Sequence, residues 1–374
     1  MPPGQTWLLR SDASRLVSVA TASGYGPLPQ LQPHRSQGHR GIDKAICLYG
    51  ENRTLTAPED NEVLIKVRAA SVNPLDLGEL KGVPYIFRIA LGLRKPGVTR
   101  PGRPGVDVAG LVEAVGRNVT HFKPGDEVFG VCISNPQASG VKVWVHHQGA
   151  FAEYACVPES KLVLKPNNVT FEQAASVPVA ALTALQGLRN KGHIQPGQRV
   201  LIHGAAGGVG TFAVQIAKSF GADVTAVSST GNVDMVRSIG ADQVIDYTQE
   251  DFTKSGQHYD LIFDCYANHP LSACKRVLNR KGIYVGVGAP AAAGGIGILT
   301  RLVQMLVFSR LTSQKLITFL AKPSKDDLII LRDLVATGKV TPVIDRCYRL
   351  REVPEAIRYL EQGHARGKVV ITLE

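Results

Sequence analysis

The chain has 374 residues, of which 44% are hydrophobic and 20% charged, which is the composition of a globular protein and excludes a disordered or collagen-like chain. Its 42 lysines and arginines exceed its 31 aspartates and glutamates, so the formal net charge is +11. The basic residues are scattered and accompany no nucleic-acid-binding motif, so we expect no nucleic-acid partner. The six cysteines show no C-x-x-C spacing, which excludes a disulfide scaffold and argues against a zinc knuckle or a redox dithiol.

Residues 1–43 differ in composition from the rest of the chain. They contain four arginines and two aspartates but neither glutamate nor lysine, and they are rich in Ser, Pro, Gly and Gln. Because they show no lasting hydrophobic period, they predict a disordered N-terminal extension. Such a composition is typical of a variable tail or of an organelle transit peptide. We therefore expect a cytoplasmic protein, with an organelle as the alternative if this segment is a transit peptide.

Short apolar runs separated by Pro-Gly and Gly-Asp turns follow from residue 44 onward. Within residues 62–69, for example, Val63, Ile65 and Val67 recur at every second position, as in a half-buried strand. The predicted strands cover residues 45–48, 62–69, 105–115, 127–131 and 152–157. Many short strands with frequent turns predict a small all-β barrel domain over residues 44–168.

Strand and helix patterns alternate in the next part of the chain. Predicted strands cover residues 199–203, 223–227, 243–246, 260–264 and 282–287, and predicted helices cover residues 171–176, 180–189, 209–220, 233–239 and 270–278. This alternation predicts a doubly wound parallel sheet over residues 169–310. The chain is therefore expected to be an α/β protein of more than one domain.

Residues 298–320 are mostly aliphatic and are interrupted by Arg301, Arg310 and Lys315. They predict one or two helices that are apolar on most sides. Such helices could be buried against the core or a subunit interface, or they could make a weak contact with a membrane surface through their basic residues. No segment of the chain is predicted to span a membrane.

The strongest chemical signal is a glycine-rich turn between a predicted strand and a predicted helix. Gly204, Gly207 and Gly210 follow the strand at 199–203 and open the helix at 209–220. In a βαβ unit, such glycines permit a tight turn, the approach of backbone amides to a pyrophosphate, and close packing of helix and strand. The helix N-terminus then faces the phosphates of a dinucleotide. The candidate cofactor-binding residues of this loop are Gly204, Ala206, Gly207, Gly208 and Val209.

The end of the next strand indicates which dinucleotide binds. An acidic residue there would bond the ribose 2′-hydroxyl of NAD. Residues 228–232 read Ser-Ser-Thr-Gly-Asn instead, and Asp223 lies at the opposite end of the strand. Small hydroxyl residues leave room for a 2′-phosphate, so NADP(H) is the expected cofactor.

Further motifs carry a family resemblance. They are residues 70–76 (ASVNPLD), 104–110 (PGVDVAG), 122–128 (FKPGDEV), 149–154 (GAFAEY), 240–247 (GADQVIDY) and 366–370 (RGKVV), together with the glycine loop. From residue 44 to its end, the chain resembles zinc-free members of the medium-chain dehydrogenase/reductase superfamily, in the quinone oxidoreductase-like group. The resemblance implies a GroES-like catalytic domain over 44–168, a Rossmann domain over 169–310 and a return of the chain to the catalytic domain over 311–374. Dimers and tetramers both occur in this superfamily, and a homodimer is the expected assembly.

The resemblance also implies roles for residues around the cofactor. Ser229 or Thr230 would bind the adenosine phosphate, with Tyr247 nearby. Many relatives carry a basic residue at the position of Gly231, so the chain departs from the pattern there. The other candidates, expected to contact the cofactor near the nicotinamide or from the last strand, are Thr183, Val287, Gly288 and Lys368.

Zinc-dependent relatives use Cys, His and Cys as catalytic ligands, and the aligned positions here are Asn73, Val106 and Val179. Valine cannot bind a cation, and the lobe with four close cysteines that holds a structural zinc in relatives is also missing. We therefore expect no metal site.

Without a Lewis acid, the hydride acceptor must already be activated, as quinones and α,β-unsaturated carbonyls are. Asn73 is the candidate to hydrogen-bond the acceptor oxygen or the nicotinamide ribose, and Asp76 is the candidate to orient neighbouring groups or to serve the structure. The sequence thus predicts an NADPH-dependent, zinc-independent reductase of small-molecule quinones or enones. Two alternatives stay open: an NAD(P)-dependent dehydrogenase or reductase of another activated carbonyl, and a cofactor-binding, membrane-peripheral protein with little turnover.

Overall fold

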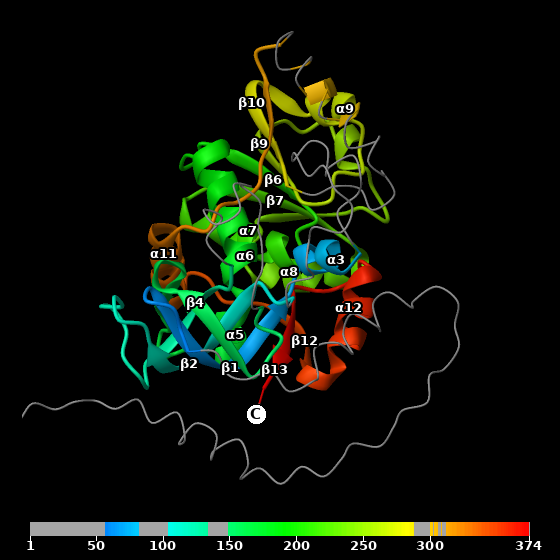
Figure 1. Cartoon of the computed structure of the whole chain (residues 1–374). Helices are drawn as coiled ribbons and strands as arrows, with labels where there is room; N and C mark the ends of the chain where they lie inside the picture. The colour runs from blue at the N-terminus through cyan, green and yellow to red at the C-terminus, as the bar shows by residue number, and fades with distance from the viewer. Residues whose placement is uncertain are drawn as a thin grey trace, which may run out of the picture. The chain divides into compact units, whose positions relative to one another are not determined.

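The computed structural model describes residues 57–81, 104–133, 149–287, 300, 301, 303–305, 308 and 312–373. All of them belong to one compact unit of the chain, Gly41–Glu374. Two β-sheets, one of seven strands and one of six, form the framework of this unit (Figure 1). The predictions for residues 1–43, for a strand at 45–48 and for Gly288 lie outside the described residues.

The first sheet brings together strands from both ends of the described chain. Its order is β12-β13-β1-β2-β3-β5, and β4 also pairs with β1. Val63, Ile65 and Val67 of β1 are buried in one core, as their alternation predicts. Because β1 pairs with β13, Ser71 lies opposite Val370 near the carboxyl end of β1. The strands are β1 (Glu62–Val72), β2 (Asp107–Val115), β3 (Glu127–Val131), β4 (Tyr154–Pro158), β5 (Leu162–Leu164), β12 (Ile344–Arg349) and β13 (Lys368–Thr372).

The second sheet is parallel, in the order β11-β10-β9-β6-β7-β8. The strand order reverses between β6 and β9, and in open α/β sheets ligands bind at the carboxyl ends of the strands at such a switch point. The strands are β6 (Arg199–His203), β7 (Asp223–Ser228), β8 (Gln243–Asp246), β9 (Tyr259–Asp264), β10 (Leu278–Gly286) and β11 (Lys315–Thr318).

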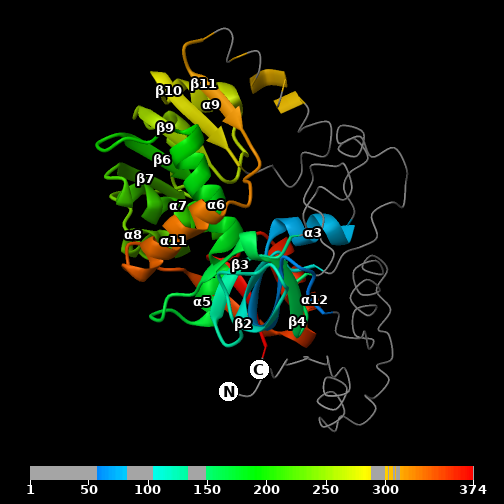
Figure 2. The ribbon, with the colours of Figure 1, turned by 60° about the vertical axis from the view of Figure 1, so that its left-hand side comes forward.

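Apolar cores cover both faces of the second sheet. Along β6, Val200 and Ile202 enter one core and Leu201 enters the other, because successive side chains of a strand alternate in direction. Helices α7 (Gly208–Ser219) and α8 (Val233–Ser238) pack into the first core and α9 (Leu271–Arg276) into the second (Figure 2). The sheet is therefore doubly wound, which confirms the predicted fold class.

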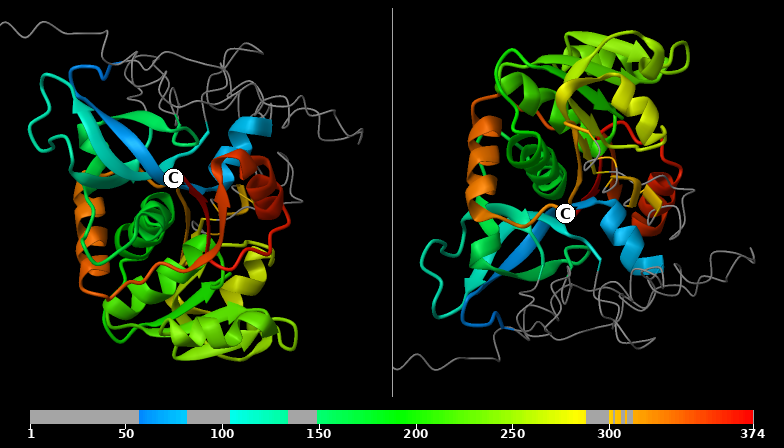
Figure 3. Two further views of the ribbon diagram at one scale, coloured as in Figure 1. Left: turned by 90° about the horizontal axis from the view of Figure 1, so that it is seen from below. Right: turned by 90° about the horizontal axis from the view of Figure 1, so that it is seen from above.

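One apolar core also joins the two sheets. It contains Ala69 and Phe129 of the first sheet, residues of β6 and β9, and helices between them. Those helices are α5 (Phe171–Ser176), α6 (Pro178–Leu185) and α11 (Lys325–Ala336). Helix α5 begins with a capping box at Thr170, and α6 continues as a π-helix over Gln186–Lys191. Helix α11 packs along α6 (Figure 3). Helix α12 (Val353–Glu361) covers the first sheet with Val353, Ala356 and Ile357.

The prediction of helices throughout residues 298–320 is wrong at its C-terminal end. Residues 300, 301, 303–305 and 308 are helical, but Lys315–Thr318 form β11 and pair in parallel with β10. A short apolar run fits a buried strand as well as a helix, and here the free edge of the sheet decides. Met305 and Leu316 are buried, whereas Val303 is 51% exposed. Within the described residues, no helix is both long and apolar enough to cross a membrane.

Candidate cofactor and active site

The glycine-rich turn follows β6, at the switch point of the parallel sheet. Gly204 leaves the strand with φ of +78°, in the left-handed region that favours glycine. Gly207 is the N-cap of α7 and has no side chain to cap the helix. The first backbone N–H groups of a helix have no acceptor within the helix. In α7 these groups therefore stay available to an anion, whose charge the helix dipole favours.

The space around each glycine shows whether the glycine is needed for packing within the protein or for room beside a ligand. A Cβ on Gly210 would collide with the carbonyl oxygen of Gly204, so this glycine is needed for helix and strand to pack. A Cβ on Gly207 would meet only that same oxygen, at 3.5 Å. None of the described residues requires glycine at 207, but a phosphate drawn close to the backbone would. The loop thus fits the pyrophosphate of a dinucleotide.

The last strand of the first sheet is tied directly to this loop. Gly367 forms a β-bridge with Gly207, and its N–H donates to the Ala206 carbonyl at 2.8 Å. A Cβ on Gly208 would lie 3.1 Å from Cδ of Lys368, so the lysine side chain passes across the start of α7. Lys368, the first residue of β13, therefore contacts the start of α7 from the first sheet.

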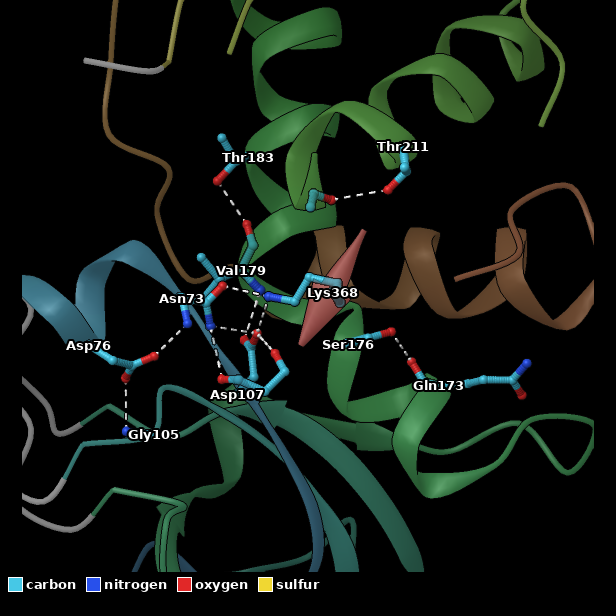
Figure 4. A network of polar contacts seen from close by, with 12 residues as sticks. Asn73, Asp76, Gly105, Asp107, Gln173, Ser176, Val179, Thr183, Thr211 and Lys368 are labelled. Atoms are coloured by element: carbon cyan, nitrogen blue, oxygen red, sulfur yellow. Dashed lines mark hydrogen bonds and ion pairs between the residues drawn. The ribbon is translucent and has the colours of Figure 1, made fainter. Parts of the chain in front are cut away.

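A buried polar network centred on Asp107 receives that lysine (Figure 4). The Asp107 carboxylate accepts hydrogen bonds from Ser71 Oγ (2.6 Å), Asn73 Nδ2 (2.9 Å) and the Val179 N–H (2.9 Å). Lys368 Nζ lies 3.4 Å from Asp107 Oδ2 and donates to Asn73 Oδ1 at 2.6 Å. Since Asp107 and Lys368 are both almost fully buried, the network holds a charge pair in the interior.

The hydrogen bonds of Asn73 limit what this residue can do. Its Nδ2 group donates to Asp107 and to the Ser71 carbonyl (3.2 Å), which uses both amide hydrogens. In this arrangement Asn73 has no N–H left for an acceptor oxygen. The Lys368 ammonium has three N–H groups and, among the described residues, two acceptors, so one donor remains for a bound molecule.

Asp76 lies beside this network on α3 (Pro74–Lys81) and orients the backbone. Its carboxylate accepts from the N–H groups of Asn73 (2.7 Å) and Gly105 (2.8 Å) and is fully buried. Burial raises the pKa of Asp76 to about 7, although the two backbone N–H groups and Lys368 act in the opposite direction and the Asp107 charge reinforces the rise.

This pKa predicts a pH-dependent stability. Because the folded-state pKa is raised, the contribution of Asp76 is fully present below the ordinary value of 3.8 and is lost as the pH rises through about 7. We expect the difference in melting temperature between the native protein and Asp76→Asn, which cannot ionise, to shift in favour of the variant between pH 4 and pH 8. Thermal melts across this range check it, and parallel pH curves for the two proteins would contradict the assignment.

Hydroxyl residues gather at the ends of β7 and β8. The Ser229 Oγ accepts from Asn232 Nδ2 at 3.1 Å and keeps its own hydrogen for another partner. The Thr230 hydroxyl donates to Asp246 Oδ2 at 2.6 Å, so it is already engaged. Tyr247 is 57% exposed, and its N–H donates to the Ser228 carbonyl, which places it beside the two hydroxyl residues.

The predicted residues thus fall into three groups. Asn73, Asp76 and Lys368 lie together around Asp107, and Thr183 lies one helical turn beyond Val179, to whose carbonyl it donates at 2.7 Å (Figure 4). The loop residues Gly204, Ala206, Gly207, Gly208 and Val209 form the start of α7, and Ser229, Thr230 and Tyr247 lie at the carboxyl ends of β7 and β8. Val287 follows β10, and its N–H donates to the Asp264 carbonyl.

Asp107 was not singled out from the sequence, although it is the centre of the network. The sequence does show that Asp107 lies within the mostly apolar residues 106–112. A buried carboxylate needs hydrogen-bond or charge partners, so this position could have indicated a polar network. Of the three positions aligned with zinc ligands, Val106 and Val179 offer no donor side chain, and the Lys368 ammonium approaches the Asn73 oxygen. This donor set does not fit a zinc ion, and the described residues contain no cluster of three metal-binding side chains.

A dinucleotide cradle at the switch point of a doubly wound sheet, beside a buried polar site at the other sheet, defines a nicotinamide-dependent oxidoreductase. Two family models match the chain: "Alcohol dehydrogenase GroES-like domain" over residues 59–167 and "Zinc-binding dehydrogenase" over residues 239–371. The chain belongs to the medium-chain dehydrogenase/reductase superfamily, in its zinc-free quinone oxidoreductase-like group.

Individual relatives agree with this family. The chain is 35% identical to the mouse (Mus musculus) NAD(P)H oxidoreductase RTN4IP1, mitochondrial, over 89% of this chain and 88% of that protein. It is 34% identical to an Arabidopsis thaliana NADPH-dependent alkenal/one oxidoreductase, chloroplastic, over 88% of this chain and 76% of that protein. The solved quinone oxidoreductase from Coxiella burnetii is 30% identical, with a TM-score of 0.70, and the match covers 86% of this chain and 93% of that one.

Proposed function

We propose that the protein is an NADPH-dependent reductase that transfers a hydride to quinones or α,β-unsaturated carbonyls without a metal. One observation carries the proposal furthest: the Lys368 side chain joins the glycine loop to the Asp107 network. One lysine side chain therefore separates the phosphate-binding loop from a polar site that can donate a hydrogen bond to an oxygen of a bound molecule. The names of the relatives, an alkenal/one oxidoreductase and a quinone oxidoreductase, support the acceptor class.

The chain's own residues would divide the work as follows. The backbone amides of Gly208 and Val209 bind the pyrophosphate, and Thr183 and Val287 line the nicotinamide end. The reduced nicotinamide, when bound, supplies the hydride. Asp107 and Asn73 hold Lys368 so that its remaining N–H donates to an oxygen of the bound molecules, and Asp76 fixes the backbone at Asn73. Positioning of this kind suffices for an acceptor that is already activated.

The preference for NADPH over NADH rests on the end of β7. Ser228, Ser229 and Thr230 stand where an acid would select NAD, and the nearest carboxylate, Asp246, lies on the neighbouring strand and already accepts from Thr230, Thr248 and Gln249. The NADPH-dependent relative has the same preference in its name.

Metal independence can be tested together with the acceptor class. After dialysis against a chelator, we expect unchanged NADPH oxidation with 9,10-phenanthrenequinone or an alkenal, because the described residues contain no cluster of metal-binding side chains. A simple ketone and its alcohol serve as controls and should not react, since a hydrogen bond from Lys368 does not replace the Lewis acid that an unactivated carbonyl needs, and the described residues contain no metal-binding cluster. Lost activity that zinc restores would contradict the mechanism.

Assembly and location are proposed on separate observations. A homodimer is proposed because β11 is an edge strand of the parallel sheet among the described strands, and its outer backbone groups could pair with a second copy of the chain. An organelle rather than the cytoplasm is proposed because the relatives are named mitochondrial and chloroplastic. Membrane-surface contact stays a prediction, since Met305 and Leu316 of the apolar stretch are buried whereas Val303 and Leu320 are exposed.

A further inference from the structure

The surroundings of Gly231 contain a cation from a distant part of the chain. A Cβ placed on Gly231 would meet one atom, Nη2 of Arg366, at 3.4 Å. Arg366 lies in the connection between α12 and β13, and its side chain is exposed. Among the described residues, its guanidinium has no hydrogen-bond or ion-pair partner. A free guanidinium therefore stands beside the turn that follows β7.

The backbone on either side of Arg366 is fixed in this place. The N–H of Arg366 donates to Asp345 Oδ2 at 2.9 Å, and the Tyr359 hydroxyl donates to the same oxygen at 2.6 Å. The next residue, Gly367, has φ of +92° and is bridged to Gly207. The connection is thus tied to the first sheet on one side and to the glycine loop on the other, so it holds Arg366 at the adenosine end of the cradle.

The polar groups around this guanidinium suit a phosphate monoester. Ser229 Oγ accepts from Asn232 and has no acceptor of its own among the described residues, and Asp246 is the carboxylate that the neighbouring Thr230 contacts. Asp246 is covered by hydrogen bonds from the side chains of Thr230, Thr248 and Gln249, which compete with any pairing to Arg366. A planar guanidinium can bind two oxygens of one phosphate, and such charge-assisted bonds are stronger than neutral ones.

We propose that Arg366 binds the adenosine 2′-phosphate of NADPH and takes the place of the basic residue that many relatives carry at the position of Gly231. The proposal rests on the proposed function and names the residue that sets its cofactor preference. NADH carries a hydroxyl in place of the phosphate and gains little from the guanidinium. Removing the Arg366 side chain should therefore weaken the binding of NADPH but not that of NADH.

The experiment uses two probes that lack the nicotinamide, 2′,5′-ADP and 5′-AMP. In Arg366→Ala, we expect the affinity for 2′,5′-ADP to fall about 10- to 100-fold by calorimetry, as loss of a charged hydrogen bond predicts. The affinity for 5′-AMP should stay as in the native protein. In kinetics, the KM for NADPH should rise by a similar factor, with kcat and the KM for NADH unchanged.

Two further variants sharpen this test. Arg351→Ala removes an exposed arginine from the short 3-10 turn Leu350–Glu352 and should leave both probes unaffected, which excludes a general effect of net charge. Gly231→Lys in the Arg366→Ala background should restore binding of 2′,5′-ADP, because the cation then enters from the other side of the same space.

The outcomes separate the two proposals. Equal loss of 2′,5′-ADP and 5′-AMP in Arg366→Ala, or no loss of either, would overturn the role of Arg366, whatever the activity. A protein that discriminates the two probes through Arg366 but reduces no quinone or enone would retain this inference and lose the proposed function.

Discussion

Replacing Gly207 by aspartate is expected to abolish NADPH binding while the ligand-free protein stays folded. Gly207 is the N-cap of α7 with φ −81° and ψ 173°, an extended conformation that any residue adopts. Aspartate is a favoured N-cap residue, so the free energy of unfolding should stay level or rise by a few tenths of a kcal/mol. Its carboxylate would accept hydrogen bonds from the backbone amides that otherwise bind the pyrophosphate, and it would repel the pyrophosphate charge. The affinity for NADPH should therefore fall by ~100-fold or more.

Fluorescence titration with NADPH and a thermal melt of the same sample check both halves of this result. Gly210→Ala is the matched control, since its Cβ would collide with the Gly204 carbonyl and should damage folding itself. If Gly207→Asp bound NADPH with native affinity, the glycine loop would not be the cofactor site.

Asp107→Asn should cause the largest loss of stability in the site. The substitution removes the negative charge that faces Lys368 and places an amide group among donors from Ser71, Asn73 and Val179. Breaking a buried charge pair from one side costs about 3–5 kcal/mol of unfolding free energy, because the remaining charge stays buried without its partner. Urea denaturation measures this loss.

A double-mutant cycle shows whether the cost arises from the pair. Lys368→Met removes the other charge, and the Asp107→Asn, Lys368→Met double variant should lose less stability than the sum of the single variants. Strict additivity would mean that Asp107 and Lys368 are not coupled, and the network would then not be organised around their charges.

Local patterns of the sequence predicted most of the fold. β6, α5 and β8 occupy the predicted residues because their signals are local: an apolar run before glycines, a capping box at Thr170, and a short run before a turn. The strand β11 was missed because a four-residue segment with only two apolar residues takes its structure from the neighbouring β10, which sequence periodicity does not show.

The candidate site divides in the same way. The glycine loop was predictable because its chemistry is contained in seven consecutive residues, 204–210. The contact between Asn73 and Lys368 joins the first and the last strands of the described chain, and it also uses up the hydrogen bonds that a free Asn73 would offer. Neither the central role of Asp107 nor the approach of Arg366 to Gly231 could follow from spacing alone, since each depends on pairing between distant strands.

Transfer of deuterium from NADPH in which both hydrogens at nicotinamide C4 are deuterium tests the central claim most directly. The protein is incubated with the labelled cofactor and an alkenal or a quinone, and the product is analysed by mass spectrometry, with Gly207→Asp as the control that lacks the cofactor site. A hydride-transfer reductase predicts that the alkenal product carries one deuterium on the carbon beta to the carbonyl and that cofactor is consumed in equal amount, and that the control forms no product. Binding of NADPH without any labelled product or cofactor consumption would contradict the reductase and favour a cofactor-binding protein with little turnover.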